Sequence, residues 1–347
     1  MSNSNIRIIV ENNIPYVKGL LDPYATVRYL EPEEITPKAV RDTDGLVVRT
    51  RTRCDASLLD KSDVKIIATA TIGTDHIDKD YCDSHSIVTV NAPGCNAPAV
   101  AQYVFASLMQ VINRPIASYT IGIVGVGHVG SIVARWAQGL GMRVLLCDPP
   151  RQRAEGGDCW TDLATIAREA DIITFHTPLT REGADATFHL AGRDFFRSLR
   201  RAPIIINSAR GGITDTPSLV EAKKNGYTGP LVIDCWEGEP AIDSELLSLA
   251  TIATPHIAGY SQDGKVRASQ VVMDAMTTFF MLPRVTVDMP MPMRPANRVA
   301  VRDIVSSYDP RVDTAALKEN PGNFEALRNH YKLRREVPEA WINPVGD

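Results

Sequence analysis

The sequence predicts an α/β protein with two doubly wound parallel-sheet domains and a small C-terminal segment. Two observations predict this class. Short apolar, β-branched runs alternate with polar or helical segments through roughly residue 255, and such alternation favours parallel strands joined by crossover helices. The runs are also apolar throughout rather than at every second residue, as expected for strands buried on both faces.

Two consecutive series of strands carry this pattern. In the first series, polar or Pro-started turns such as 37–41 and 56–60 separate the expected strands, which are 6–10, 26–30, 45–50, 64–70 and 87–91. A helix expected at 97–113 leads to the second series, with strands at 120–126, 143–148, 171–176, 204–207, 231–234 and 251–254. The helices expected within and after it are 129–140, 162–170, 194–199, 218–225 and 265–282.

The chain after this second series is less informative. Residues 281–295 read MLPRVTVDMPMPMRP, and four prolines in so short a stretch favour a connector over a regular helix or central strand. A helix is expected around residues 323–336, with no catalytic pattern in the last fifty residues.

Composition excludes several classes of function. The net charge of −4 and a pI near 6.0 argue against a nucleic-acid-binding surface, which is normally basic. The N-terminus has no signal-peptide pattern and no apolar run is long enough to cross a membrane. The six cysteines form no CxxC pair, so we expect free thiols in a reducing cytoplasm and no bound metal.

A glycine-rich turn is the sharpest local signal. Gly125, Gly127 and Gly130 form a GxGxxG motif between an expected strand and an expected helix. The first glycine permits a tight turn, the second lets the backbone approach a pyrophosphate, and the third allows close packing of helix on strand. The helix N-terminus would bind the phosphates. The alternative is a flavodoxin-like domain with an incidental glycine turn.

An acidic residue follows at the spacing that dinucleotide sites require. Asp148 closes the next expected strand, eighteen residues after Gly130, where a carboxylate bonds the ribose hydroxyls of NAD. Its charge would repel the 2′-phosphate of NADP, so the sequence favours NAD as cofactor. Arg151 and Arg153 lie nearby and leave NADP as the alternative.

Three side chains at successive strand ends form a candidate catalytic set, namely Arg210, Glu239 and His256. A guanidinium can hold a substrate carboxylate through two parallel hydrogen bonds. An imidazole can take a hydroxyl proton as hydride leaves, and a neighbouring carboxylate would orient that imidazole and stabilise its charged form. Each residue alone fits an ordinary turn or surface position, but together they predict oxidation of a 2-hydroxy acid.

These motifs resemble the D-isomer-specific 2-hydroxyacid dehydrogenase family over roughly residues 6–282. The resemblance implies a flavodoxin-like substrate domain with an inserted Rossmann domain. The substrate-binding domain would be discontinuous, with residues 1–95 and 260–282, and the NAD-binding domain would span residues 96–259. Residues 283–347 would form a C-terminal segment with a role in dimerisation, so the resemblance also implies a homodimer.

Within the family, several stretches resemble the branch that oxidises 4-phospho-D-erythronate in vitamin B6 biosynthesis. They are ATATIGTDHID (68–78), NAPGCNAPAV (91–100), CDPPR (147–151), DCWEGEP (234–240) and HIAGYSQDGK (256–265). The resemblance implies substrate contacts at Thr50, Thr71 and Tyr260. It implies further cofactor contacts at His128, Val129, Thr177, Ser208, Ala209, Asp234 and Gly259.

A phosphorylated substrate needs a cation other than Arg210. Arginines alternate along Arg49, Arg51 and Arg53 at an expected strand end, so some of them can share a face. We expect Arg49 or a neighbour to bind the substrate phosphate; the alternative is a solvated basic edge. Other family substrates (phosphoglycerate, glyoxylate, lactate) remain open alternatives, as does an NAD-sensing, corepressor-like binding protein.

Overall fold

The computed structural model describes residues 6–288 and 307–337. Within these ranges the chain forms two compact units. Residues 6–96 and 262–288 form the smaller unit, and residues 97–261 and 307–337 form the larger unit. The chain therefore returns to the smaller unit two residues later than the expected boundary at residue 260. No helix within these described ranges is long and apolar enough to span a membrane.

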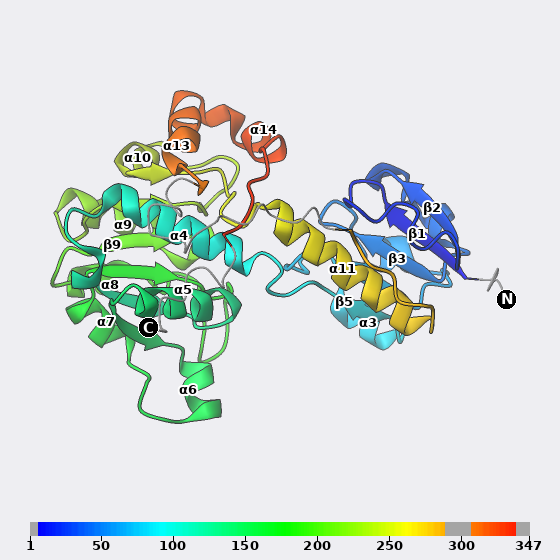
Figure 1. The fold of residues 1–347 in the computed structure, drawn as a ribbon, viewed down its shortest axis with the longest axis horizontal. Coiled ribbons are helices and arrows are strands. Elements are labelled where there is room, and N and C mark those ends of the chain that lie inside the picture. Colours follow the sequence, from blue (N-terminus) through cyan, green and yellow to red (C-terminus); the bar gives the residue numbers. More distant parts are fainter. Residues whose placement is uncertain (1–5, 289–306, 338–347) are drawn as a thin grey trace, which may run out of the picture. The chain divides into compact units, whose positions relative to one another are not determined.

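The smaller unit is built on a five-stranded parallel sheet (Figure 1) with the order β2-β1-β3-β4-β5. This is the strand order of flavodoxin-like folds. Its strands are β1 (Arg7–Glu11), β2 (Thr26–Leu30), β3 (Gly45–Val48), β4 (Ile66–Thr69) and β5 (Val88–Val90). The expected fold class is confirmed for this unit, because all pairings are parallel and the strand cores lie where the apolar runs predicted them.

Successive side chains along these strands are buried on opposite faces of the sheet. Ile8 and Val10 pack in one cluster with Met276 of the long helix α11 (Gln262–Phe279), whereas Ile9 packs in another cluster with Leu58. The second cluster lies under three short helices, α1 (Pro37–Val40), α2 (Ala56–Leu59) and α3 (Lys79–Ser84). The segments 37–41 and 56–60, expected as turns, are thus single helical turns, with side-chain caps from Thr36 and Asp55.

The larger unit contains a six-stranded parallel sheet with the order β11-β10-β9-β8-β6-β7. Its strands are β6 (Thr120–Val124), β7 (Arg143–Cys147), β8 (Ile172–Phe175), β9 (Ile204–Asn207), β10 (Leu231–Ile233) and β11 (Ile252–Ala253). The chain runs outward from β6 to β7 and then returns to the other side of β6 with β8. This reversal is the position where open α/β sheets bind ligands, at the carboxyl ends of the strands.

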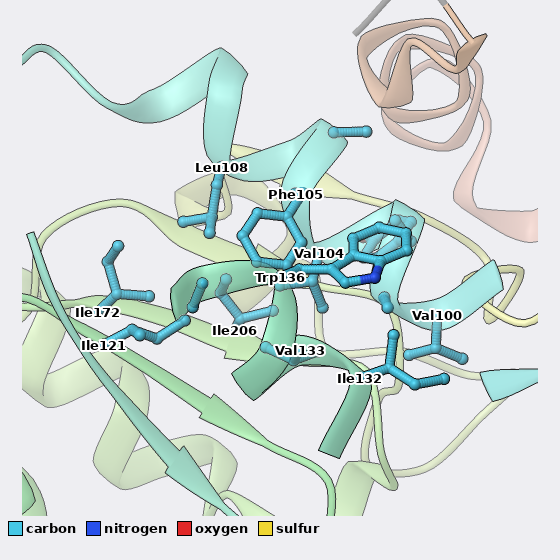
Figure 2. Close-up of a cluster of buried hydrophobic side chains, with 14 of the residues drawn as sticks. Val100, Val104, Phe105, Leu108, Ile121, Ile132, Val133, Trp136, Ile172 and Ile206 are labelled. Carbon is cyan, nitrogen blue, oxygen red and sulfur yellow. The ribbon is translucent and has the colours of Figure 1, made fainter. Parts of the chain in front are cut away.

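Helices cover both faces of the larger sheet (Figure 1). Helices α4 (Ala97–Val111) and α5 (His128–Gly139) cover one face, where Phe105 and Trp136 lie with ring centroids 5.6 Å apart over Ile121 and Ile206 (Figure 2). The other face carries α7 (Leu163–Glu169), α8 (Arg193–Ser198), α9 (Thr216–Lys224) and α10 (Ser244–Leu249). A further helix, α6 (Pro149–Glu155), follows β7.

Residues 307–337 pack onto the larger unit. They contain α13 (Pro310–Glu319) and α14 (Phe324–Asn329), and Leu317 and Phe324 are buried in the core of that unit. The expected helix at 323–336 ends after two turns. Beyond it, Arg334 pairs with Ser261 in a parallel β-bridge, so long-range contacts override the local helical pattern.

Candidate active site

The glycine-rich turn adopts the conformation that the motif predicts. Gly125 follows β6 with φ +86°, and a Cβ placed there would lie 2.7 Å from the backbone nitrogen of Thr177. A Cβ on Gly130 would lie 2.1 Å from the carbonyl oxygen of Gly125. These two glycines are therefore required by the packing of the turn against β8 and of helix α5 against the turn.

Gly127 differs because the protein itself does not require a glycine there. A Cβ on Gly127 would meet nothing within 4 Å, and the residue caps the N-terminus of α5, whose first residues are His128 and Val129. A cavity of about 430 Å³ opens beside the turn and is lined by Gly125, Gly127, Asp148 and Thr177 among others. An open cradle at a helix N-terminus fits the pyrophosphate of a dinucleotide.

Asp148 lies at the end of β7 on the wall of this cavity. Its Oδ2 accepts a hydrogen bond of 2.8 Å from the Val126 N–H, and its Oδ1 accepts one of 3.1 Å from the Arg151 N–H. The carboxylate thus also shapes the glycine-rich turn. Each oxygen keeps further acceptor capacity toward the cavity, which fits binding of ribose hydroxyls.

Two other predicted cofactor residues have buried hydroxyl groups without a protein partner. Within the described residues, neither Thr177 Oγ1 nor Ser208 Oγ has a hydrogen-bond partner. Buried hydroxyls are normally bonded, so these two fit a site that a ligand completes. Ala209 lies next in the chain, and its N–H donates to Asn207 Oδ1 at 3.2 Å.

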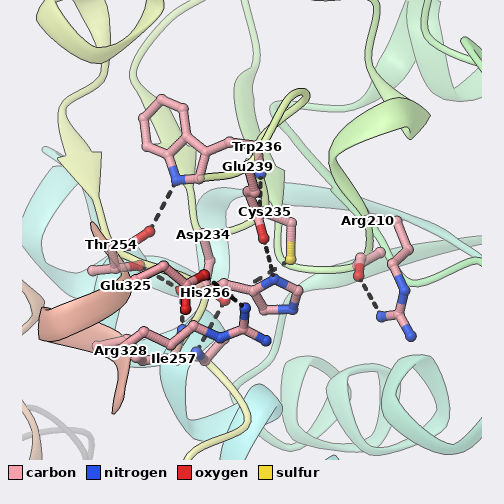
Figure 3. A network of polar contacts seen from close by, with 12 residues as sticks. Arg210, Asp234, Cys235, Trp236, Glu239, Thr254, His256, Ile257, Glu325 and Arg328 are labelled. Atoms are coloured by element: carbon pink, nitrogen blue, oxygen red, sulfur yellow. Dashed lines mark hydrogen bonds and ion pairs between the residues drawn. The ribbon is translucent and has the colours of Figure 1, made fainter. Parts of the chain in front are cut away.

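The predicted base and its predicted carboxylate partner are in direct contact. His256 Nδ1 lies 2.8 Å from Glu239 Oε2, and Glu239 Oε1 accepts a hydrogen bond of 2.7 Å from the Trp236 N–H. Figure 3 shows this pair beside the thiol of Cys235. Because the Glu239 carboxylate can only accept a hydrogen bond, Nδ1 of the neutral ring carries the proton and donates it, and Nε2 is left as the basic nitrogen.

The protonation of this pair departs from that of free side chains. Burial opposes a charged imidazole, but contacts with Cys235 and Glu239 prevail and raise the pKa of His256 well above its usual value. Burial raises the pKa of the Cys235 thiol, whereas its contact with His256 lowers that pKa. Burial opposes the charged form of Glu239 as well, yet its contacts with His256 lower the pKa of this carboxyl group.

Arg210 reaches the same pocket from the neighbouring strand. It follows β9, is exposed, and donates from Nη1 to the Ala209 carbonyl oxygen at 2.8 Å. A Cβ on Gly211 would lie 2.0 Å from the carbonyl oxygen of Trp236, so this glycine lets the Arg210 loop pack directly on the Glu239 loop. The three predicted catalytic residues line one pocket of about 280 Å³ in the larger unit.

Asp234 lies in the interior of the larger unit, with no exposed surface. Its Oδ1 accepts hydrogen bonds from the Thr254 hydroxyl and the Ile257 N–H, and its Oδ2 accepts one from the Ala258 N–H. These contacts fix the turn that carries His256, which has a left-handed φ of +56°. Gly259, another predicted cofactor residue, is half-buried at the end of this turn.

The C-terminal segment brings a residue to the site that sequence reasoning missed. Arg328 on α14 donates from Nε to the Tyr260 hydroxyl at 3.1 Å, and its charge helps to lower the pKa of Glu239. Figure 3 shows Arg328 on the side of His256 away from Arg210. No motif marks it, because its place depends on how residues 307–337 pack.

The remaining predicted substrate contacts lie in the smaller unit. Arg49 and Thr50 directly follow β3, and Thr71 follows the adjacent parallel strand β4, so all three lie at one edge of the sheet. Thr71 Oγ1 lies 2.7 Å from Thr69 Oγ1. Burial lowers the pKa of Lys265, with a smaller contribution from Arg49, so two cations lie near each other at this edge.

Two groups of potential metal ligands occur among the described residues. One is the catalytic pair with Cys235, and the other is His189 with Asp215 and Glu237. In the second group, His189 Nε2 faces Glu237 at 2.6 Å while Nδ1 faces Asp215 at 3.5 Å. Opposite ring nitrogens cannot both bind one ion, so this geometry describes a hydrogen-bonded chain rather than a convergent metal site.

Comparison with known proteins agrees with the geometry. Residues 100–258 match the NAD-binding domain of the D-isomer specific 2-hydroxyacid dehydrogenases. The erythronate-4-phosphate dehydrogenase of Bacteroides thetaiotaomicron is 47% identical over 98% of this chain and 99% of its own length. That of Porphyromonas gingivalis is 43% identical over 96% of this chain and 94% of its own.

Solved structures show the same architecture. An Aquifex aeolicus D-lactate dehydrogenase in complex with NAD and lactic acid superposes with a TM-score of 0.65 at 24% identity, covering 79% of this chain and 95% of its own. An NAD⁺-bound 3-phosphoglycerate dehydrogenase of Entamoeba histolytica gives 0.65 at 25% identity, covering 80% and 96%. These structures confirm the predicted fold class, and the match of residues 100–258 to the family's NAD-binding domain confirms NAD as the cofactor.

Proposed function

The chain belongs to the D-isomer-specific 2-hydroxyacid dehydrogenase family, and we propose that it oxidises 4-phospho-D-erythronate to 3-hydroxy-2-oxo-4-phosphobutanoate in pyridoxal 5′-phosphate biosynthesis. One observation carries the chemistry: Arg210, Glu239 and His256 line a single pocket, with the imidazole bonded to the carboxylate. The substrate assignment rests on near-full-length relatives named erythronate-4-phosphate dehydrogenase.

Each residue of the pocket has its own role in the proposed reaction. The Arg210 guanidinium holds the substrate carboxylate through two parallel hydrogen bonds. His256 Nε2 takes the proton of the C2 hydroxyl, and Glu239 stabilises the imidazolium that forms. NAD held in the cavity lined by Gly125, Gly127, Asp148 and Thr177 would supply the acceptor for the hydride of C2, so that the hydroxyl carbon becomes a carbonyl. In the reverse direction His256 returns the proton to the carbonyl oxygen.

The raised pKa of His256 bears on the direction of the reaction. Oxidation begins with the neutral ring, whereas reduction of the oxo acid needs the imidazolium. Since Glu239 favours the imidazolium, the pair stabilises the state that oxidation produces and that reduction requires. The same pair therefore serves both directions, and pH selects between them.

Further parts of the proposal concern the surroundings of the pocket. Thr50, Thr71, Tyr260 and Arg49 would contact the substrate. The enzyme would act as a homodimer, and the exposed Val312 on α13 is an apolar side chain available for such an interface. None of the six cysteines forms a disulfide within the described residues, which fits a reducing cytoplasm. Sedimentation of the purified protein would test the dimer.

The experiment that tests the function is NADH formation by the purified protein with NAD and each of three acids. The acids are 4-phospho-D-erythronate, 3-phosphoglycerate and D-lactate. We expect turnover selective for 4-phospho-D-erythronate. Turnover with another acid alone would keep the roles of the pocket and replace the substrate, whereas tight NAD binding without any turnover would favour an NAD-sensing protein.

A further inference from the structure

The guanidinium of Arg328 lies near the catalytic Glu239 although the residue comes from the C-terminal segment. Its Nε donates to the Tyr260 hydroxyl at 3.1 Å, and the Arg328 and Glu239 charges shift each other's pKa. Arg328, Glu239 and His256 all belong to the larger unit. The position of this cation relative to the catalytic pair is therefore built into one compact body.

The terminal nitrogens of Arg328 are only loosely paired. Nη1 lies 3.9 Å from Oε1 of Glu325, whose side chain is 52% exposed. Such an exposed ion pair contributes little free energy. Within residues 6–288 and 307–337, neither terminal nitrogen donates a hydrogen bond. The Arg328 side chain is 30% exposed, so these nitrogens can reach a bound molecule.

Two guanidinium groups lie near the catalytic pair, because Arg210 lines the same pocket as His256 and the charge of Arg328 acts on Glu239. In the view of Figure 3 the His256 ring lies between Arg210 and Arg328. A simple 2-hydroxy acid has one anionic group, and Arg210 alone satisfies it. A second cation beyond the base matches a substrate with an anionic group at each end and the reacting hydroxyl between them.

We propose that Arg328 binds the phosphate of the substrate while Arg210 binds its carboxylate; the proposal rests on the function proposed above. A guanidinium is suited to this task because its planar N–H groups match two phosphate oxygens. The bond from Nε to Tyr260 fixes the plane of the group and leaves its terminal nitrogens for the ligand. The C-terminal segment thereby selects phosphorylated acids.

The test compares the full-length enzyme with Arg328→Met and Arg328→Lys, using 4-phospho-D-erythronate and its unphosphorylated analogue D-erythronate. Loss of a charge-assisted bidentate contact should raise the KM for the phosphorylated acid roughly 30-fold in Arg328→Met. The KM for D-erythronate should stay within about twofold. Lysine keeps the charge without the fork, so its KM should lie between those of the wild type and Arg328→Met.

The matched control is Arg311→Met, which removes an exposed arginine of the same segment that pairs with Asp309 at 2.7 Å. Thermal unfolding and the Kd for NAD should match the wild type in every variant compared. Calorimetry of inorganic phosphate with the NAD-bound protein adds a readout that needs no turnover. Phosphate should bind the wild type and Arg311→Met, and bind Arg328→Met at least tenfold more weakly.

Equal changes of KM for the two acids would overturn the proposal, because they would assign Arg328 a role in shaping the pocket. Phosphate binding that survives Arg328→Met would also overturn it. If Arg49→Ala raises the KM selectively for the phosphorylated acid and Arg328→Met does not, the phosphate subsite belongs to the smaller unit. Failure of the proposed function would give a different result, because the wild-type enzyme itself would then not turn over 4-phospho-D-erythronate.

Discussion

Asp234 and Arg334 both bind the backbone of the same two residues, Ile257 and Ala258. Asp234 accepts the N–H groups of Ile257 at 2.8 Å and Ala258 at 2.9 Å, and Arg334 donates to the carbonyl oxygens of both residues. Both side chains are buried. Because Ile257 and Ala258 directly follow His256, Asp234 at the end of β10 and Arg334 of the C-terminal segment together fix the backbone that carries the catalytic base.

Replacing Arg334 with Met should therefore impair both stability and catalysis. Arg334 is 7% exposed and also donates to the Ala99 carbonyl oxygen at 3.1 Å, so three buried carbonyl groups would lose a donor. We expect a loss of roughly 3 kcal/mol in the free energy of unfolding, measured by urea denaturation. The kcat should fall at least tenfold at saturating NAD, because the His256 turn is no longer held.

The control for Arg334 is Lys332→Met, an exposed cation two residues earlier. It should leave both quantities near those of the wild type. If Arg334→Met unfolds like the wild type and keeps its kcat, the contacts with residues 257 and 258 do not position the base.

The fold could be predicted from the sequence where the signal is local. Buried parallel strands are marked by their own apolar runs, and the strands at 26–30 and 204–207 begin and end where expected. Helix α13 was not expected, although Asp309 followed by Pro310 is a recognisable helix start. The end of α14 could not be predicted, because Arg334 is held by Ser261 and by carbonyl groups far away in the sequence.

The candidate site likewise has residues that the sequence predicts and one that it does not. Arg210, Glu239 and His256 could be found because parallel strands bring their carboxyl ends to one edge of a sheet, so successive strand ends predict proximity. Arg328 lies in the expected helix 323–336 together with Lys332, Arg334 and Arg335, and nothing in that stretch indicates which of them lies near Glu239. Its contact with Tyr260 spans 68 residues and follows from tertiary packing alone.

The pH dependence should report the contact between Glu239 and His256. Oxidation needs the neutral ring, so kcat/KM for the hydroxy acid should fall as pH drops through the raised pKa of His256. In Glu239→Gln the negative charge is gone, the pKa should decrease, and the acid limb should move to lower pH by about one unit or more. The rate at high pH should also decrease, because the imidazolium loses its partner.

Glu237→Gln is the matched control for this prediction. Glu237 undergoes the same change of charge in the same pocket but contacts His189 instead of His256. Its profile should keep the acid limb of the wild type. Identical shifts in the two variants would assign the effect to the overall charge of the pocket.

Substitutions at two glycines of the dinucleotide turn should have different effects on NAD binding and on stability. Gly127→Ala adds a methyl group that meets no protein atom within 4 Å, so its free energy of unfolding should change by less than about 1 kcal/mol. The Kd for NAD should rise roughly tenfold or more, because the methyl group fills the approach to the pyrophosphate.

Gly130→Ala should show the opposite pattern, in which stability is the quantity that falls. The new Cβ would lie 2.1 Å from the Gly125 carbonyl oxygen, so helix α5 must shift and stability should fall by about 2 kcal/mol or more. Urea denaturation without cofactor and titration with NAD measure the two quantities. Stability lost in Gly127→Ala, or kept in Gly130→Ala, would contradict the roles assigned to these glycines.

Asp148 should discriminate between NAD and NADP. Asp148→Asn removes the charge that repels a 2′-phosphate and one acceptor for the ribose hydroxyls, so the ratio of kcat/KM for NAD to that for NADP should fall about 10- to 100-fold. Asp162→Asn makes the same change on the wall of the same cavity, at the N-terminus of α7. Since Asp162 is not at the end of a sheet strand, its variant should keep the wild-type ratio. An equal fall in both variants would mean that the total charge of the cavity, and not the carboxylate of Asp148, selects the cofactor.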